Sequence, residues 1–512
     1  MGHVSAARDS PERAGKHGSR ALARNTLYNV LGQVFPLLVG VFAIPITLRG
    51  LGAVRFGLLG LVWAVLGYFG VLDLGLGRAT TKFVAEYLGR AEAVQVRRVA
   101  TLAVASQTVL GVLGGILLAL LTPVAVDRLL GIPASLQAEA RGAFFILAVS
   151  VPFVVLSLSL RAILEAAQRF DLVNLIRTPT SAAVFLIPAI AVQFGARLPI
   201  IVLLLLLARV GTCWATAAAV PRAIPGFRLE IRSDWETFRP LLGFGGWIAV
   251  SNVVSPLLSY LERFVLASVA GVAAVAYYAA PFEAVTRILI APAGLASALF
   301  PVLSVTDAER RAPQERLLGL SVRYLLLLLA APIMLLVGLS GPLMSAWLGS
   351  DYAKRGAPAL AILAVGVFAN ALAHLPSVYL LGRGRPDIPA KFHLLELPVY
   401  LAMAWALIAR LDVTGAALAW TIRVTLDAAL LAVAVWRVAG LSPSRLFGPR
   451  LGRAVTAIGV LALVALAVGA GGVLGTAARI GVLTVAVAAF GAFVWAFVFD
   501  ASERARMLRG IA

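Results

Sequence analysis

The chain has 512 residues, of which 61% are hydrophobic and only 13% carry a charged side chain. Soluble domains carry about 25% charged residues, so this composition excludes a water-soluble protein and favours one that faces lipid. The formal net charge of +20 does not indicate a nucleic-acid partner, because Lys and Arg fall in short clusters between apolar runs. The one cysteine, Cys213, excludes a disulfide within the chain and a cysteine-based metal site.

The first 24 residues form a polar, basic stretch that we interpret as a cytoplasmic tail. No short apolar run with a small-residue cleavage site occurs there, so we do not expect a signal peptide. From residue 26 onward, apolar runs of about 20 residues, the length that spans a bilayer, follow one another. We predict an all-α polytopic membrane protein with about fourteen transmembrane helices, at 26–48, 57–77, 99–122, 142–164, 172–194, 199–220, 241–266, 272–303, 321–347, 357–381, 391–409, 413–438, 454–474 and 480–499.

The distribution of basic residues predicts the orientation of these helices. With the N-terminal tail inside, 31 of the 44 Lys and Arg residues fall in or beside inside loops, and 9 fall in or beside outside loops. Basic residues concentrate in cytoplasmic loops of membrane proteins. We therefore expect both termini in the cytoplasm, in a bacterial or archaeal cell (inner) membrane.

A weak internal repeat suggests two related halves. Val34-Phe35-Pro36-Leu37-Leu38 resembles Val254-Ser255-Pro256-Leu257-Leu258, and each stretch precedes a loop glycine, Gly52 and Gly271. Secondary transporters are commonly built from two such halves. The predicted organisation is a tail (1–24), a six-helix bundle (25–220), a linker (221–240), a second six-helix bundle (241–438), two extra helices (439–499) and a C-terminal tail (500–512).

The chain lacks the motifs of ATP hydrolysis and metal catalysis. No G-x-x-x-x-G-K-[ST] loop and no H-E-x-x-H occurs in the sequence. The loops between the apolar runs are short, and this leaves no room for an ATPase module or a large external catalytic loop. We expect no cofactor and no enzymatic activity.

Polar side chains recur at helical spacing within two apolar runs. Asn25, Asn29 and Gln33 share one face of the first predicted helix, and Ser251, Ser255, Ser259 and Glu262 share a face of the seventh, beside Asn252. Such faces are unfavourable in contact with lipid. They either pack against neighbouring helices or line a hydrated cavity.

Charges inside the predicted helices are costly unless they are paired or hydrated. Opposite charges four residues apart can form ion pairs on one helix face. Alternatively, an arginine can hold an anionic headgroup, because its planar donors match two phosphate oxygens. Both interpretations are open for Asp73 with Arg78, Glu262 with Arg263, Glu283 with Arg287, His393 with Glu396, and Arg423 with Asp427.

The chain resembles a known family over essentially its whole length, and the resemblance is most specific near the N-terminus. Four stretches are similar to the start of oligosaccharide flippases: Arg24-Asn25-Thr26-Leu27-Tyr28-Asn29, Leu51-Gly52, Phe56-Gly57 and Leu72-Asp73-Leu74-Gly75-Leu76-Gly77-Arg78. A later part of these proteins is similar to Ala298-Leu299-Phe300-Pro301-Val302-Leu303. These flippases export O-antigen and polysaccharide repeat units and belong to the multidrug/oligosaccharidyl-lipid/polysaccharide (MOP) superfamily.

The resemblance implies two pseudo-symmetric six-helix bundles around a central cavity, plus two C-terminal helices. It implies that the protein flips a polyprenyl-diphosphate-linked oligosaccharide from the cytoplasmic to the periplasmic leaflet by alternating access, for cell-surface polysaccharide biosynthesis. On this reading Arg24, Arg78, Arg263 and Arg287 engage the diphosphate. The sugar-binding candidates are Asn25, Asn29, Gln33, Asn252 and Ser255, and Asp73 or Glu283 couple transport to H⁺ or Na⁺.

Four alternatives stay open at this point. A lipid II-type flippase or a multidrug exporter of the same superfamily would share the helix pattern. A membrane glycosyltransferase would need an acidic pair or a long external loop, and a scaffold protein would not need buried charges. The expected partners are the lipid-linked oligosaccharide, membrane lipids and other membrane proteins of polysaccharide assembly.

Overall fold

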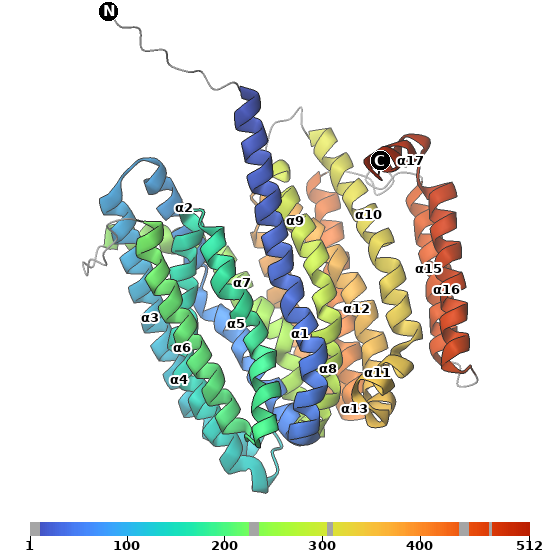
Figure 1. Ribbon diagram of the computed structural model, residues 1–512, viewed down its shortest axis with the longest axis horizontal. Coiled ribbons are helices and arrows are strands. Elements are labelled where there is room, and N and C mark those ends of the chain that lie inside the picture. The colour runs from blue at the N-terminus through green and yellow to red at the C-terminus, as the bar shows by residue number, and fades with distance from the viewer. Residues whose placement is uncertain (1–10, 225–234, 305–310, 440–449, 471–473, 512) are drawn as a thin grey trace, which may run out of the picture. The chain divides into compact units, whose positions relative to one another are not determined.

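The computed structural model describes residues 11–224, 235–304, 311–439, 450–470 and 474–511, which are almost entirely helical and contain no β-strand (Figure 1). Twelve helices in these ranges are long and apolar enough to cross a membrane. The prediction of an all-α polytopic membrane protein is confirmed. The described part of each of the fourteen predicted segments is mostly helical, but the count of fourteen separate spans stays a prediction.

The elements follow one another with short connections. The first half of the chain contains α1 (Pro11–Tyr68), η1 (Phe69–Asp73), α2 (Leu76–Gly89), α3 (Ala93–Val124), α4 (Ala134–Ala166), α5 (Phe170–Ala191) and α6 (Leu198–Ala223). The second half contains α7 (Trp235–Ala270), α8 (Val272–Thr286), η4 (Arg287–Leu289), α9 (Ile290–Leu303), α10 (Arg311–Gly338), α11 (Ser340–Leu348), α12 (Ser350–Gly382), α13 (Asp387–Ala439), α15 (Arg450–Ala470), α16 (Thr476–Phe493) and α17 (Ala501–Ile511).

Two of the long helices contain one residue with non-helical torsion angles. These residues are Gly52 in α1, with φ 72° and ψ 167°, and Asp412 in α13, with φ 53° and ψ −128°. Each lies in the gap between two predicted segments, 26–48 and 57–77 for α1, and 391–409 and 413–438 for α13. The sequence thus located both breaks.

Three predicted segments are interrupted within their length. One of them, 321–347, spans α10 and α11, which are separated at Leu339. The prediction of a helix over 57–77 is wrong at its end, because α1 ends at Tyr68 and α2 begins only at Leu76. Leu74 and Gly75 have φ values of 47° and 79°, which a continuous right-handed helix cannot contain. The segment predicted at 272–303 is likewise divided, since the 3₁₀ turn at η4 separates α8 from α9.

By their internal contacts, the helices group into two units. The first takes its described residues from within Met1–Gly50, Gly75–Ala119 and Phe145–Gly245. The second takes them from within Leu51–Leu74, Leu120–Phe144 and Gly246–Ala512. The second unit therefore includes two stretches of the predicted N-terminal bundle, while the linear boundaries of that bundle stay a prediction.

Close backbone packing holds one of these stretches inside the second unit. A Cβ atom built on Gly57 would lie 2.0 Å from the carbonyl oxygen of Val272, so only glycine permits this approach. Gly60, three residues later, lies in contact with Ala279. The start of α8 thus packs directly on the second part of α1.

Gly52 and Gly271 support the internal repeat. Gly271 separates α7 from α8 with φ 86° and ψ 163°, within about 15° of the values at Gly52. This region of torsion space is accessible almost only to glycine. The two glycines that the sequence aligned therefore occupy the same backbone conformation in the two halves.

Candidate functional site

The residues of the polar face predicted on the first helix belong to α1. Arg24, Asn25, Asn29 and Gln33 fall within Pro11–Tyr68, but their side chains lie outside the described residues. The same holds for Asn252 on α7. Their assignment to a substrate stays a prediction.

Asp73 and Arg78 lie on the two sides of the interruption between α1 and α2. Asp73 is the half-buried last residue of η1, and Arg78 is an exposed residue in the first turn of α2. This break lies between two candidate membrane spans, one ending at Tyr68 and the next beginning at Ala93. The motif Asp73-Leu74-Gly75 thus marks a structural break as well as a charge.

A network of ion pairs connects α7 and α8 inside the second unit. Arg263 is completely buried and donates to Glu283 Oε1 at 3.0 Å and to the carbonyl oxygen of Gly60 at 3.3 Å. Arg287 donates to Glu283 Oε2 at 2.9 Å from one turn further along. Glu283 therefore bridges two arginines, and the predicted contact between Glu283 and Arg287 is present.

A second buried carboxylate lies beside this network. Glu262 has no exposed surface and accepts hydrogen bonds from the hydroxyls of Tyr278 at 3.0 Å and Tyr400 at 2.8 Å. Adjacent residues of α7 thus face different partners, Glu262 toward α8 and α13, and Arg263 toward α8 and α1. A buried charge is costly unless it is paired or hydrogen-bonded: Arg263 is paired with Glu283, and Glu262 is hydrogen-bonded by two tyrosines.

Exposure separates the two candidate arginines of this network. Arg263 has 0% of its side chain exposed and also packs against the rings of Phe282 and Tyr260, at 4.7 and 5.2 Å. Arg287 keeps 35% of its side chain exposed. In this conformation Arg287 can reach a ligand, while Arg263 holds Glu283 and α1 in place. Ser255, on the same helix as Arg263, is exposed.

A second cluster of titratable groups lies on the two parts of α13. Arg423 Nη1 lies 3.6 Å from Glu396 Oε2, and His393 Nε2 lies 3.8 Å from Asp427 Oδ1. The sequence predicted the pair Arg423–Asp427 from its spacing, but the ion pairs instead connect residues on opposite sides of Asp412. The break in α13 brings the two parts of this helix together, which a same-helix pairing rule does not consider.

This cluster is incompletely hydrogen-bonded. Both carboxylate oxygens of Glu396, Oδ1 of Asp427 and Nδ1 of His393 are buried without a hydrogen-bond partner. No group of three or more His, Cys, Asp or Glu residues in the described part of the chain has a metal-binding arrangement. The carboxylates of this cluster therefore keep free acceptor positions, whereas both oxygens of Glu283 are engaged by guanidinium groups. The i, i+3 spacing of His393 and Glu396 was the signal for it in the sequence.

The sequence matches a family model described as polysaccharide biosynthesis protein over residues 22–306, more than half of the chain. It is 32% identical, over 416 residues, to a Shigella flexneri protein named "Putative O-antigen transporter". The aligned region covers 80% of this chain and 97% of that protein.

Two solved structures share the fold. An inward-facing multidrug resistance MATE family transporter of the MOP superfamily superimposes with a TM-score of 0.68 at 16% identity, over 80% of this chain and 98% of that one. The lipid II flippase MurJ, in an inward closed conformation, gives a TM-score of 0.66 at 14% identity, over 92% of this chain and 98% of that one. At these identities the likeness concerns the fold alone.

Proposed function

Because this chain belongs to the polysaccharide biosynthesis protein family, we propose that it is a flippase that moves a lipid-linked oligosaccharide across the membrane. The substrate is a polyprenyl-diphosphate-linked oligosaccharide, and the direction is from the cytoplasmic to the outer leaflet. The observation that carries the proposal is the 32% identity to the Shigella flexneri protein named "Putative O-antigen transporter", over 97% of the length of that protein. The product serves cell-surface polysaccharide biosynthesis.

We assign the roles of these residues from the chemistry of their side chains. Arg287, with Arg24 and Arg78, engages the diphosphate, because a guanidinium group can donate to two phosphate oxygens at once. Asn25, Asn29, Gln33, Asn252 and Ser255 bind the sugar hydroxyls. Transport proceeds by alternating access, and the protein makes or breaks no covalent bond.

Transport is coupled to H⁺ or Na⁺ in this proposal. Asp73 and Glu283 are the carboxylates that the sequence nominated for this role. Glu396 and Asp427 are two further candidates, since buried carboxylate oxygens without a hydrogen-bond partner leave acceptor positions free for a coupling ion. Replacing each by its amide should show which one carries the coupling.

The protein acts in the bacterial or archaeal cell (inner) membrane, with both termini in the cytoplasm. The excess of Lys and Arg on one side of the predicted helices supports this orientation. Membrane lipids and other membrane proteins of polysaccharide assembly are its expected neighbours.

The experiment that tests the function is a translocation assay in proteoliposomes. It compares a polyprenyl-diphosphate oligosaccharide, lipid II and a cationic drug as substrates of the wild-type protein. The proposal expects movement of the oligosaccharide lipid. Selective movement of lipid II or of the drug would instead identify a lipid II-type flippase or a multidrug exporter.

The Arg287→Ala variant tests the site within the same assay. Glu283 keeps Arg263 as its partner in this variant, so we expect the protein to fold. Loss of one charge-assisted contact to phosphate should slow translocation by about tenfold or more. Arg410→Ala, which removes an exposed arginine of α13, is the matched control and should transport normally. Equal rates in wild type and Arg287→Ala would remove Arg287 from the site.

A further inference from the structure

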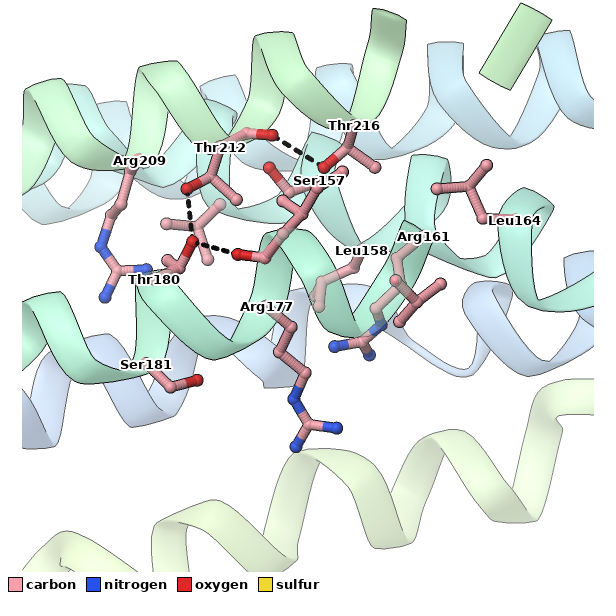
Figure 2. Close-up of a pocket in the computed structure, with 13 residues that line it drawn as sticks. Ser157, Leu158, Arg161, Leu164, Arg177, Thr180, Ser181, Arg209, Thr212 and Thr216 are labelled. Carbon is pink, nitrogen blue, oxygen red and sulfur yellow. Dashed lines mark hydrogen bonds between the residues drawn. The ribbon is translucent and has the colours of Figure 1, made fainter. Parts of the chain in front are cut away.

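A small cavity of about 150 Å³ lies inside the first unit, between α4, α5 and α6 (Figure 2). None of the residues that the sequence assigned to substrate lines it. Pockets for drug-sized ligands measure roughly 300–1,000 Å³, so this cavity is too small for an oligosaccharide. It is large enough for a headgroup-sized ligand.

Each of the three helices contributes one arginine to the cavity. They are Arg161 on α4, Arg177 on α5 and Arg209 on α6. Figure 2 shows the side chain of Arg161 extending toward that of Arg177, and the two charges are close enough to repel each other. Two cations side by side within a membrane protein are unfavourable unless an anion lies between them.

Only Arg161 forms an ion pair with an acidic residue, Glu165, which also attracts Arg177 without contacting it. Arg161 Nε lies 3.3 Å from Glu165 Oε1, at the edge of the cavity. Neither Arg177 nor Arg209 forms an ion pair with any residue that the structure describes. No acidic side chain is among the described residues that line the cavity. Three arginines and one glutamate at the edge therefore leave the cavity with an excess of positive charge.

Four of the five hydroxyl groups among the lining residues, all but that of Ser181, are already engaged as donors. Thr180, Thr212 and Thr216 each donate to the carbonyl oxygen four residues earlier, at 2.7–2.8 Å. The hydroxyls of Thr180 and Thr212 also lie 2.8 Å apart (Figure 2). The donors that remain for a ligand are thus mainly guanidinium N–H groups, which select an anion with several acceptor oxygens.

The position of Arg161 and Arg177 along their helices matches the depth of a headgroup. Arg161 lies five residues before the end of α4 and Arg177 seven residues after the start of α5. At 1.5 Å per residue, both lie about 7–11 Å from the connection between these helices. Arg209 lies deeper, in the middle of α6, and apolar side chains such as Val154 and Leu158 complete the lining.

We propose that this cavity is a binding site for a phosphate group, with Arg161 and Arg177 on the phosphate oxygens. An anionic glycerophospholipid and a free phosphate ion share this chemistry. The apolar lining favours the lipid, whose ester oxygens face Arg209 at the inner end of the cavity. The site is separate from the transport residues, and it does not depend on the proposed function.

Native mass spectrometry of the purified full-length protein tests this site. The probes are dioleoyl phosphatidylglycerol, dioleoyl phosphatidylcholine and inorganic phosphate. We expect the wild type to bind phosphatidylglycerol at least about tenfold more tightly than phosphatidylcholine, because choline repels the arginines. Displacement of phosphatidylglycerol by millimolar inorganic phosphate would identify the free ion as the ligand, and its persistence would identify the lipid.

Arg177→Gln should abolish the preference for phosphatidylglycerol. Arg222→Gln, which removes an exposed arginine of α6 outside the cavity, should keep it. Without lipid, Arg177→Gln should have an unchanged or higher thermal unfolding midpoint, because it removes an unpaired charge. A destabilised Arg177→Gln would indicate a purely structural arginine and overturn the proposal.

Two further outcomes would also overturn it. These are equal binding of the two lipids by the wild type, and an unchanged preference in Arg177→Gln. Arg177→Lys keeps the positive charge but lacks the planar guanidinium group, which donates to two phosphate oxygens at once. Its preference for phosphatidylglycerol over phosphatidylcholine should therefore be smaller than that of the wild type. It separates the contribution of the charge from that of the guanidinium geometry at the same position.

Discussion

Glu262 illustrates how a single buried residue can connect several helices of this protein. Its carboxylate is fully buried, and its two oxygens accept hydrogen bonds from two tyrosines on different helices. Arg263, the next residue, bonds to two further groups. Sequence spacing placed Glu262 on a polar face with Ser255 and Ser259, but only the neighbouring helices show that this glutamate is a structural centre.

Removing one donor to Glu262 should destabilise the second unit. Tyr400→Phe deletes a hydroxyl that donates to a buried carboxylate, and such a bond contributes about 1.5–3 kcal/mol. Tyr352→Phe is the matched control, because the hydroxyl of Tyr352 is buried without a hydrogen-bond partner. Thermal unfolding in detergent should show a lower midpoint for Tyr400→Phe and an unchanged or higher one for Tyr352→Phe. Equal shifts would contradict the role assigned to Glu262.

Asp500 caps the C-terminal helix α17 through a reciprocal arrangement. Its carboxylate accepts hydrogen bonds from the Ser502 hydroxyl at 2.6 Å and the Glu503 backbone N–H at 2.7 Å, while Glu503 accepts from the Asp500 backbone N–H at 2.9 Å. This is a capping box. Glu503 also forms an ion pair with Arg323 of α10, so the cap connects α17 to the helices of the second unit.

The capping box predicts how α17 responds to mutation and pH. Asp500→Ala should increase amide hydrogen exchange in α17 at pH 7, whereas Asp500→Asn should preserve most of the protection. The hydrogen bond from Ser502 lowers the pKa of Asp500 to about 2. The cap is therefore complete above the unfolded-state value of about 3.9 and is lost only as the pH falls toward about 2. Loss of protection between pH 5 and 7 would contradict this assignment.

At the scale of elements, residues with positive φ values divide the long apolar runs into separate helices. Gly52, Gly271 and the pair Leu74-Gly75 interrupt long apolar runs with positive φ values. The sequence predicted loops at the first two positions from a glycine after a proline-containing helix. It missed the third, because Asp73-Leu74-Gly75-Leu76 lies within a run that is apolar enough to continue as a helix.

The torsion angles at Gly52 and Gly271 allow a direct test of the repeat. Nothing lies within 4 Å of a Cβ atom built on either glycine, so alanine would cost backbone strain alone, about 1–3 kcal/mol. Gly459→Ala is the control, since this glycine lies inside α15 in equally open space and alanine favours a helix. We expect lower unfolding midpoints for Gly52→Ala and Gly271→Ala, but not for Gly459→Ala.

At the scale of the molecule, the chain forms two contact units that alternate along the sequence. Helical stretches from the first half belong to the second unit, which a linear division into halves does not describe. The resemblance to MOP superfamily exporters is confirmed by the family match and by the fold shared with a MATE transporter and MurJ.

The predicted orientation can be tested with single cysteines. Cys213, the one native cysteine, is buried and can be replaced by alanine. In that background, Arg128→Cys follows α3 and Arg90→Cys precedes it, at exposed positions. A thiol reagent that does not cross membranes should label Arg128→Cys in intact cells, and Arg90→Cys only after lysis. The reverse pattern would invert the topology.

The sequence by itself determined the fold class, the course of most helices and the family. Apolar runs of membrane-spanning length and alternating basic loops are local properties that can be recognised in the sequence. A helix is one of the few structures whose backbone groups are all hydrogen-bonded inside a bilayer, so each such run is expected to be helical. The sequence also singled out the charged residues within apolar runs, such as Glu283 and Arg287, because a charge inside the membrane is energetically costly.

The tertiary structure decided which charges meet. Arg423 pairs with Glu396 across the break in α13 rather than with Asp427, and Arg263 is buried while Arg287 is partly exposed. The arginines of α4, α5 and α6 surround one cavity although they are up to 48 residues apart. Helix rotation and packing set these contacts, and both depend on neighbours distant in sequence, so spacing along a single helix could not reveal them.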